Sequence, residues 1–376
     1  ERAVYLGQAF LSGAAADAFA AWSERLLEAH LICPHWPAEV GGRGLSGVHL
    51  AILNEEFANA RVPRVTRGMG ESLVGPSIIV HGTDEQKAYF LPRIISGQDR
   101  YCQGFSEPDH GSDLAGVETR GVVDGNEVVI SGQKVWTSGA HLANMIFILC
   151  RTDPDAPKHR GLSYVLAPMA DNGIELQPLR QPTGASGFSH ELIEGCRAPL
   201  FNVIGGLNNG WRVAMTTLGN ERGGGATTQH LRYEREFWDL VDDARKRGRT
   251  SESLVRQDLA WAFTHVELMR FQGIRLLSTL AARREPGPEA SVSKLFWSEY
   301  HKRFGEIALS VTGSEGMAHL PAEGTGAEDG YRLTRWQSTF VQSRAGTIFS
   351  GTSQIQRNII GERALGLPKE PSAERS

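Results

Sequence analysis

Apolar residues recur at two different spacings along this chain, and the change of spacing divides it into three parts. Up to about residue 100 they recur every three or four positions, as in AFAAWSERLLEAH and VHLAILNEEFANA, which predicts helices. From about 101 to 205, short apolar runs are separated by turn residues, and Asp124-Gly125 predicts a β-hairpin. Helical spacing then returns. We expect a mostly α-helical protein with a central β domain, organised as a helical domain over 1–100, a β domain over 101–205 and a helical bundle over 206–376.

Two apolar stripes in the last part predict the core of that bundle. Each repeats every three or four residues and therefore follows one face of a helix. The first consists of Leu259, Phe263, Val266, Met269, Gly273, Leu276 and Leu280, and the second of Phe296, Tyr300, Phe304, Ile307 and Val311. Thr83 is predicted to cap the helix in GTDEQKAYFLPRI, and Ser353 with Gln356 fits a capping box near the end of the chain.

Composition argues against several classes of function. The net charge of -4 indicates neither nucleic acid nor an anionic membrane as a partner, and no apolar run is long enough to predict a membrane span. The opening ERAVYLGQAF lacks the pattern of a signal peptide, and the true start of the chain stays open. The cysteines are scattered without a CxxC pair, which favours reduced thiols and a cytoplasmic protein. They are Cys33, Cys102, Cys150 and Cys196.

Two short patterns suggest ligand sites by their letters alone. Gly42-x-Gly44-x-x-Gly47 matches a dinucleotide-binding pattern, but prolines rather than an apolar strand precede it. We interpret it as a connection between helices. His190-Glu191 begins like a zinc-binding helix, but Glu194 stands where a second histidine would be needed. We interpret His190 as an ordinary strand or loop residue and predict no metal site.

Three longer stretches carry candidate chemistry. GFSEPDHGSDLAG, over 104–116, is typical of an ordered loop that presents amides and hydroxyls to a ligand, or of a plain connection into the β domain. GQKVWTSGAHLAN, over 132–144, offers the flat ring of Trp136 beside two hydroxyls, which suits a planar heterocycle; the alternative is a tryptophan that covers the β core. FVQSRAGTIFSGTSQIQRNIIGERALGLP, over 340–368, predicts a tight loop that leads into a short helix.

Together these stretches resemble the acyl-CoA dehydrogenases. SEPDHGSD, GQKVWTSGAHLAN and GTSQIQRNIIGERALGLP occur in the order and at the separations of that family, and HGTDEQKAYFLPRIISG agrees as well. The resemblance implies an N-terminal helical domain, a central β-barrel and a C-terminal four-helix bundle. It also implies an oxidoreductase of lipid metabolism, acting in fatty acid β-oxidation, with bound FAD and an acyl-CoA substrate. An electron-transferring flavoprotein as acceptor and a homotetramer or homodimer complete the expectation.

The same resemblance assigns residues to the cofactor. Gln103 to Ser106, with Phe105 among them, would line the flavin ring, and Ser106 would donate to it. Trp136, Thr137 and Ser138 would flank the ring, with the Ser138 hydroxyl near flavin N5. The remaining assignments are Ser112 to the phosphates of FAD or CoA, Thr352 and Gln354 to the FAD of the same or a neighbouring subunit, and Gly313 within SVTGS to the FAD pyrophosphate and adenosine.

One part of the pattern departs from the family. Members often carry an arginine followed by Thr-Phe-Gly that binds the FAD of a neighbouring subunit. Here the region reads KRGRT over 246–250, without the aromatic residue. Arg247 and Arg249 are both candidates for that role, and a solvated basic turn is the alternative for both.

The family reaction removes an α proton from an acyl thioester while the β hydride moves to flavin N5, so it requires a base. Many members place a glutamate just before the Gly-Thr of the last motif, where this chain has Ser350. A serine hydroxyl does not take that proton unaided near neutral pH. A second arrangement in the family takes the glutamate from an earlier helix, immediately before an arginine. Glu221-Arg222 fits that arrangement.

Glu221 is therefore the predicted base, with Arg222 at the family's arginine, in the type of member whose glutamate lies on the earlier helix. The Ser350 amide, next to Gly351, would hold the thioester carbonyl. The alternative is that Glu221 only pairs with a neighbouring arginine. The glycines at 223–225 would leave room for a bulky or branched acyl group, unless they serve a kink or close helix packing.

Two rival functions stay open on this fold. The missing glutamate at 350 and the altered arginine region favour a non-catalytic or partner-requiring subunit of a heteromeric acyl-CoA dehydrogenase. A flavin oxidase or monooxygenase is the second rival. The identity of the acyl chain, whether straight, branched or steroid, is not predicted.

Overall fold

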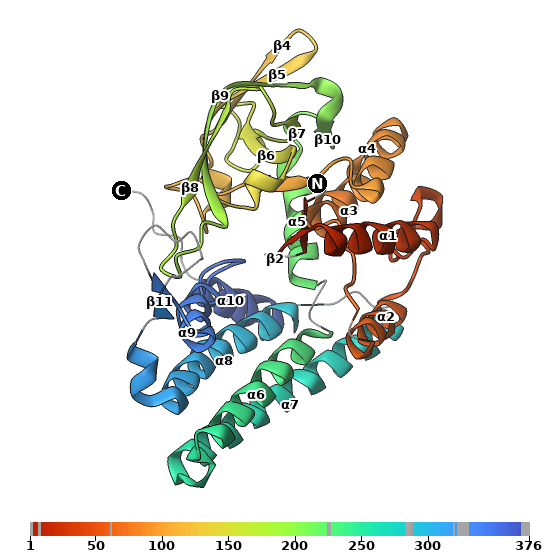
Figure 1. Cartoon of the computed structure of the whole chain (residues 1–376). Coiled ribbons are helices and arrows are strands. Elements are labelled where there is room, and N and C mark those ends of the chain that lie inside the picture. The colour runs from red at the N-terminus through yellow and green to blue at the C-terminus, as the bar shows by residue number, and fades with distance from the viewer. Residues whose placement is uncertain are drawn as a thin grey trace. The chain divides into compact units, whose positions relative to one another are not determined.

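The computed structural model describes residues 3–6, 9–60, 62–223, 227–282, 287, 289–318, 320–321 and 331–369. The chain divides into two compact units (Figure 1). The first consists of Glu1–Asp109, Ala115–Leu176 and Glu191–Thr217. The second consists of His110–Leu114, Gln177–His190 and Leu218–Ser376.

The first unit begins with a hairpin and continues as helices. Its elements are β1 (Ala3–Leu6), β2 (Ala9–Ser12), α1 (Ala14–Glu28), η1 (Ala38–Val40), α2 (Gly47–Asn59), η2 (Gly70–Val74), α3 (Gly75–His81) and α4 (Asp84–Ser96). The prediction of helix from the first residue is wrong for the hairpin, in which Val4 pairs with Leu11.

Two local predictions in this part are confirmed. Thr83 caps α4 in a capping box: its side chain accepts from the Gln86 amide at 3.2 Å, and Gln86 Oε1 accepts from the Thr83 amide at 2.9 Å. The glycine pattern connects η1 to α2. A Cβ on Gly42 would lie 2.0 Å from the Trp36 carbonyl oxygen, so glycine is required there by close backbone packing.

The β domain is one eight-stranded sheet. Its strands are β3 (Tyr101–Gly104), β4 (Arg120–Asp124), β5 (Glu127–Ser138), β6 (Met145–Arg151), β7 (Leu162–Pro168), β8 (Ile174–Leu179), β9 (Phe188–Pro199) and β10 (Val203–Ile204). They follow the order β10-β7-β6-β4-β5-β9-β8, with β3 beside β6. The predicted hairpin is β4-β5, in which Asp124 pairs with Glu127. Inward side chains of the central strands, such as Cys102, Ile146 and Val165, form a fully buried core.

Helix α5 (Gly210–Gly223) follows the sheet, and its residues up to Thr217 belong to the first unit. Two hydrogen bonds attach this part of α5 to α3. Ser77 Oγ lies 2.7 Å from Thr217 Oγ1, and His81 Nε2 lies 2.7 Å from Thr216 Oγ1. Ser77 and Thr217 are both fully buried, so this polar contact fixes α5 against α3 from inside the unit.

The second unit is built around a helical bundle. Its helices are α6 (Gln229–Lys246), η6 (Arg249–Ser251), α7 (Ser253–Ala281), α8 (Glu289–Thr312), η7 (Gly313–Met317), α9 (Arg335–Ala345), α10 (Ser353–Ile359) and η8 (Ile360–Ala364), and β11 (Leu320–Pro321) pairs with β12 (Tyr331–Arg332). No helix among the described residues has the length and apolar character of a membrane span. The four cysteines of the chain are all free and buried.

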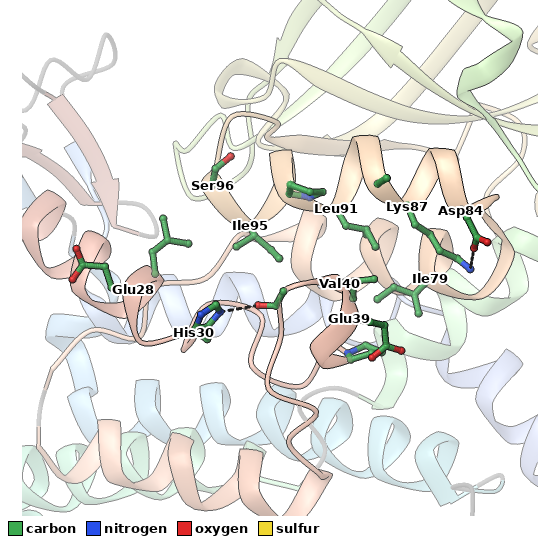
Figure 2. Close-up of a pocket in the computed structure, with 15 residues that line it drawn as sticks. Glu28, His30, Glu39, Val40, Ile79, Asp84, Lys87, Leu91, Ile95 and Ser96 are labelled. Carbon is green, nitrogen blue, oxygen red and sulfur yellow. Dashed lines mark hydrogen bonds and ion pairs between the residues drawn. The ribbon is translucent and has the colours of Figure 1, made fainter.

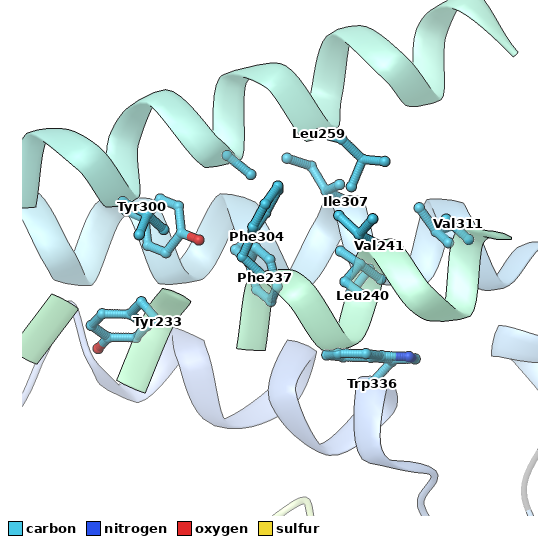
Figure 3. Packing of buried hydrophobic residues seen from close by; sticks show 14 of the residues in the cluster. Tyr233, Phe237, Leu240, Val241, Leu259, Tyr300, Phe304, Ile307, Val311 and Trp336 are labelled. Carbon is cyan, nitrogen blue, oxygen red and sulfur yellow. The ribbon is translucent and has the colours of Figure 1, made fainter. Parts of the chain in front are cut away.

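The bundle core joins α6, α7, α8 and α9, as Figure 3 shows for Phe237, Leu259, Phe304 and Trp336. The predicted stripes supply seven of its sixteen described buried residues, and the prediction of a bundle core is confirmed. It is wrong for Phe263, whose side chain is 42% exposed. That ring lies at the margin of the core, 5.6 Å from the ring of Phe237.

The start of α10 differs by one residue from the prediction. Thr352 rather than Ser353 is the cap, because its side chain accepts from the Ile355 amide at 3.1 Å. Ser353 Oγ instead donates to Glu299 at 2.7 Å, and Gln356 Nε2 donates to the Ser350 carbonyl at 3.0 Å. The predicted capping box of Ser353 with Gln356 is therefore wrong.

Candidate active site

The beginning of the first predicted stretch meets the second stretch in the first unit. The Val135 amide donates to the Ser106 carbonyl at 2.9 Å, which joins the segment after β3 to β5. Gln103 and Ser106 are half-buried. Phe105 is buried, and its ring packs edge to face on Phe147 at 5.6 Å. The Phe105 side chain therefore belongs to the core, and only its backbone can line a ligand.

A buried ion pair holds this junction in place. Lys134 Nζ lies 2.8 Å from Glu107 Oε1 and also donates to the Phe105 carbonyl at 3.1 Å. Glu107 accepts two further hydrogen bonds, from the amides of Glu118 at 2.7 Å and Thr119 at 2.9 Å. Burial alone would raise the pKa of Glu107, but the charge of Lys134 and these hydrogen bonds lower the pKa overall, so the carboxylate stays ionised. Sequence reasoning missed this pair, whose members lie 27 positions apart.

Trp136 has an unusual backbone for a bulky residue. Its φ is 64°, in the left-handed region that few residues other than glycine adopt. Lys134 and Thr137 are both buried on either side of it, so the two-residue alternation of β5 is broken here. As a result the Trp136 side chain turns outward and is 61% exposed. It does not cover the β core, which was the alternative to a ligand-facing ring.

The two hydroxyls that follow Trp136 have different surroundings. Thr137 is buried, and its Oγ1 donates a hydrogen bond to Glu191 Oε2 of β9. Ser138 is half-buried at the end of β5. The Thr137 hydroxyl is thus committed to the sheet interior, whereas the assignment of the Ser138 hydroxyl to the flavin stays a prediction. Sequence reasoning missed Glu191, because its partner Thr137 lies 54 positions away in the chain.

The third stretch, over 340–368, contains a loop of the second unit whose backbone is held by hydrogen bonds from side chains. Ser350 and Gly351 both have left-handed backbones, with φ of 54° and 87°. Lys294 Nζ donates to the carbonyls of Gly346 at 2.9 Å and Gly351 at 2.7 Å. A Cβ on Gly351 would lie 2.5 Å from Gln356 Nε2, so a side chain there would displace the Gln356 amide.

The other predicted residues of this unit are less enclosed. Thr352 uses its side chain to cap α10, whereas Gln354 and Ser112 are exposed. Gly313 has a φ of 68° at the start of η7, and a Cβ there would lie 3.4 Å from Arg249 Nη1.

Both candidate arginines are engaged within the second unit. Arg249 lies 2.7 Å from Glu252 and donates to the Val311 carbonyl at 3.1 Å, near the end of α8. Arg247 pairs with Asp243 at 3.0 Å and with Glu315 at 2.7 Å. They are therefore partly buried, ion-paired residues rather than a solvated turn. That either of them binds FAD stays a prediction.

Glu221 and Arg222 lie in the last turn of α5, four and five positions after Thr217. Their side chains fall outside the described residues, as do residues 224–226, which include two of the three glycines. The assignment of Glu221 as the base therefore stays a prediction.

A cavity of about 900 Å³ opens elsewhere in the first unit, among α1, η1, α3 and α4 (Figure 2). Its lining is mainly apolar and includes Leu27, Val40, Leu91 and Ile95. None of the predicted cofactor or substrate residues lines it. The cavity therefore adds nothing to the candidate active site.

Comparisons with known proteins identify all three parts of the chain. Residues 13–98, 102–195 and 208–365 match the N-terminal, middle and C-terminal domains of acyl-CoA dehydrogenases. The chain is 42% identical to acyl-CoA dehydrogenase IpdE1 of Mycobacterium tuberculosis over 350 residues, which cover 93% of this chain and 88% of the relative.

Solved structures agree with these matches. The Tcur3481-Tcur3483 steroid ACAD is similar with a TM-score of 0.80 and 31% identity, over 94% of this chain and 90% of the solved one. The ChsE4-ChsE5 complex from Mycobacterium tuberculosis is similar with a TM-score of 0.75 and 29% identity, over 94% and 91% of the two chains.

The residues of the first unit fit the FAD of these enzymes. Trp136 presents an exposed flat ring, Ser138 follows with a half-buried hydroxyl, and Ser106 is joined directly to the strand that carries both. A planar ring system with polar edges needs this combination of aromatic surface and nearby hydrogen-bonding groups. The chain belongs to the acyl-CoA dehydrogenase family and is a FAD-dependent oxidoreductase.

Proposed function

We propose that this chain catalyses the α,β-dehydrogenation of an acyl-CoA thioester with Glu221 as the base that removes the α proton. The observation that carries the proposal is the loop before α10. Hydrogen bonds from Lys294 and Gln356 hold this loop, yet it offers Ser350 where many relatives have the catalytic glutamate. The base must then come from another element, and Glu221-Arg222 at the end of α5 is the candidate.

The backbone of the loop has its own part in this proposal. The Ser350 amide would donate to the thioester carbonyl and draw electron density from it, which makes the α proton more acidic. Glu221 would take that proton from the α carbon. A carboxylate enclosed with an apolar acyl chain has a raised pKa, which suits it to act as a base.

On the flavin side, Trp136, Ser138 and the Gln103–Ser106 backbone would bind and orient the ring. When bound, FAD supplies the oxidant, because its N5 accepts the β hydrogen together with the electron pair. An electron-transferring flavoprotein would then reoxidise it. With four free, buried cysteines the chain suits a reducing compartment, and we propose a cytoplasmic location.

We further propose a bulky, steroid-derived acyl group as the substrate. The support is the similarity to the Tcur3481-Tcur3483 steroid ACAD, together with the glycines that follow the proposed base in sequence. A panel of CoA thioesters, with steroid-derived, branched and straight acyl groups, tests this by flavin bleaching. The steroid-derived thioesters should bleach the flavin fastest, and a preference for straight chains would exclude this substrate class.

A partner-requiring subunit is the second candidate, and two observations favour it. Arg247 and Arg249 are already engaged by acidic residues of their own unit, so neither arginine is held ready for a neighbour's FAD. The similar ChsE4-ChsE5 structure is a complex of two named proteins. Purification of the chain alone distinguishes the two proposed functions. A yellow homotetramer or homodimer supports an enzyme that binds FAD without another protein, and a colourless chain supports dependence on a partner.

The experiment that tests the main proposal is anaerobic mixing with a reactive acyl-CoA. The wild-type flavin should bleach. Glu221→Gln should stay yellow and bleach about 10²- to 10⁴-fold more slowly, the usual contribution of a general base. Glu194→Gln, at an exposed position of β9, is the matched control and should bleach at the wild-type rate. Rapid peroxide release in air would instead indicate an oxidase.

A further inference from the structure

Strand β9 has a glutamate, Glu191, at a buried position where an apolar side chain is usual. Ser189, Glu191 and Ile193 alternate with less buried neighbours, so all three belong to the inward row of the strand. Glu191 is fully buried, and Ile193 of the same row is part of the β core. An acidic side chain in such a position is costly unless specific partners hold it. Glu191 therefore lies in surroundings that favour an apolar side chain.

The partner of Glu191 is Thr137. Thr137 Oγ1 donates to Glu191 Oε2, whereas Oε1 is buried and has no hydrogen-bond partner within the described part of the chain. The carboxyl interacts electrostatically with Lys134 on β5, which is paired with Glu107, and with the Cys102 thiol on β3.

The carboxyl is neutral under mildly acidic conditions. Burial raises the pKa of Glu191 to about 7, although the Thr137 hydrogen bond, the backbone amide of Glu191 and the charge of Lys134 oppose the rise. Above that pH, an ionised carboxylate with one unpaired oxygen would sit beneath the end of β5.

Thr137 directly follows Trp136, the residue with the left-handed backbone. A left-handed conformation at a bulky residue persists only where the surrounding structure enforces it. At Trp136, hydrogen bonds on both sides contribute to this: the Val135 amide is held by the Ser106 carbonyl at 2.9 Å, and the Thr137 hydroxyl is held by Glu191. The Trp136 turn is thus fixed on both sides, and Glu191 provides the anchor on the side of Ser138.

We propose that Glu191 is a positioning residue of the flavin site, which acts through Thr137 to hold Trp136 and Ser138 in the conformation that faces the cofactor. The inference rests on the assignment of Trp136 and Ser138 to the flavin, and it is independent of which residue is the base. Glu191 itself touches no ligand in this role.

The first test needs no cofactor. Hydrogen exchange of the amides over 135–138 is measured in the apoprotein of the wild type, Thr137→Val, Glu191→Leu, Glu191→Gln and the control Glu194→Gln. Loss of the hydrogen bond should speed exchange about tenfold in the Val and Leu variants, as expected for one buried hydrogen bond. Glu191→Gln can still accept from Thr137 and should stay near the wild-type rate, as should the exposed control.

The second test is FAD binding, measured by titration of the same apoproteins. Thr137→Val and Glu191→Leu should each weaken binding about tenfold, and the double variant should be no weaker than either single one, because both changes remove the same contact. Wild-type affinity should rise as the pH rises through about 7, because the ionised carboxylate accepts the Thr137 hydrogen bond more strongly, whereas the affinity of Glu191→Gln should be independent of pH over that range. A packing role alone would produce neither the rescue by Gln nor the pH profile.

Several outcomes would overturn the inference. Unchanged exchange and FAD affinity in Thr137→Val, additive effects in the double variant, or equal losses in Glu194→Gln would each do so. If the Leu variant does not fold, the comparison of Glu191→Gln with the wild type across pH still decides. If the chain needs a partner to bind FAD, the exchange test decides. Glu221→Gln should change neither readout, so a failure of the proposed base is distinguishable from a failure of this anchor.

Discussion

Two segments of this protein hold a non-glycine residue in a left-handed backbone and are predicted to face ligands, but they are held by different chemistry. At the end of β5, Trp136 is fixed through Thr137 by a buried carboxyl group. In the loop before α10, Ser350 is fixed by the side-chain amide of Gln356, which donates to its carbonyl. A carboxyl titrates and a side-chain amide does not. The segment around Trp136 should therefore respond to pH, whereas the loop before α10 should not.

The largest effect expected from this difference is on stability. The pKa of Glu191 is raised by burial from an ordinary 4.5 to about 7, so between these values the native state holds a proton that the unfolded chain releases. The free energy of unfolding therefore falls as the pH rises through that window, by up to about 3 kcal/mol. Glu191→Gln removes this pH-dependent contribution to the free energy of unfolding. Denaturant unfolding of both proteins at pH 5 and pH 8 should show the variant gaining relative to the wild type at the higher pH.

The next largest effect on stability is expected when Lys294, which holds the loop before α10, is replaced. Lys294→Met would leave the carbonyls of Gly346 and Gly351 without their shared donor, at a cost of about 2 kcal/mol in unfolding free energy. Lys302→Met, at a half-buried side chain of the same helix whose ammonium group makes only a loose ion pair with Glu299 at 3.8 Å, is the control and should cost little. Equal losses in both variants would show that Lys294 does not support this loop.

A smaller effect separates backbone strain from crowding. Gly351→Ala places a methyl group in a left-handed position and 2.5 Å from Gln356 Nε2, whereas Gly366→Ala is left-handed with open space around it. Both should lose about 1 kcal/mol from the backbone, and Gly351→Ala should lose about 1–2 kcal/mol more because the overlap displaces Gln356. Thermal unfolding measures both, and an equal loss would mean that Gln356 moves aside freely.

The smallest expected change is a gain. Ser350→Gly keeps the amide and relieves a φ of 54°, which should stabilise the protein by about 1 kcal/mol. Acyl-CoA affinity should be nearly unchanged if only the backbone of residue 350 contacts substrate. A large loss of affinity would instead assign a role to the serine hydroxyl.

Local signals explain what the sequence predicts well. The cap at Thr83, the turn at Asp124-Gly125 and the stripe through Phe304 each depend on neighbours within a turn or two of chain, and all are confirmed. The sequence predicts the cap of α10 one residue late because Thr352 and Ser353 are both good capping residues, and only the hydrogen bond from the Ile355 amide to Thr352 distinguishes them.

Long-range partners explain what was missed. Glu191 reads as a surface residue until its contact with Thr137, 54 positions away, is known, and Glu107 depends in the same way on Lys134. The cofactor residues were predicted by family resemblance rather than by local pattern. Sequence alone suggested only that Trp136 stands beside two hydroxyls, and it gave no sign that one of these hydroxyls would be used inside the sheet.

The most direct test of the central claim concerns the two positions from which this fold can supply a base. The rate of anaerobic flavin bleaching by a reactive acyl-CoA is compared in the wild type, Glu221→Gln and Glu221→Gln/Ser350→Glu. If Glu221 is the base, the single variant should lose about 10²- to 10⁴-fold in rate, and the glutamate added in the loop before α10 should restore part of that loss. Bleaching of Glu221→Gln at the wild-type rate would contradict the account.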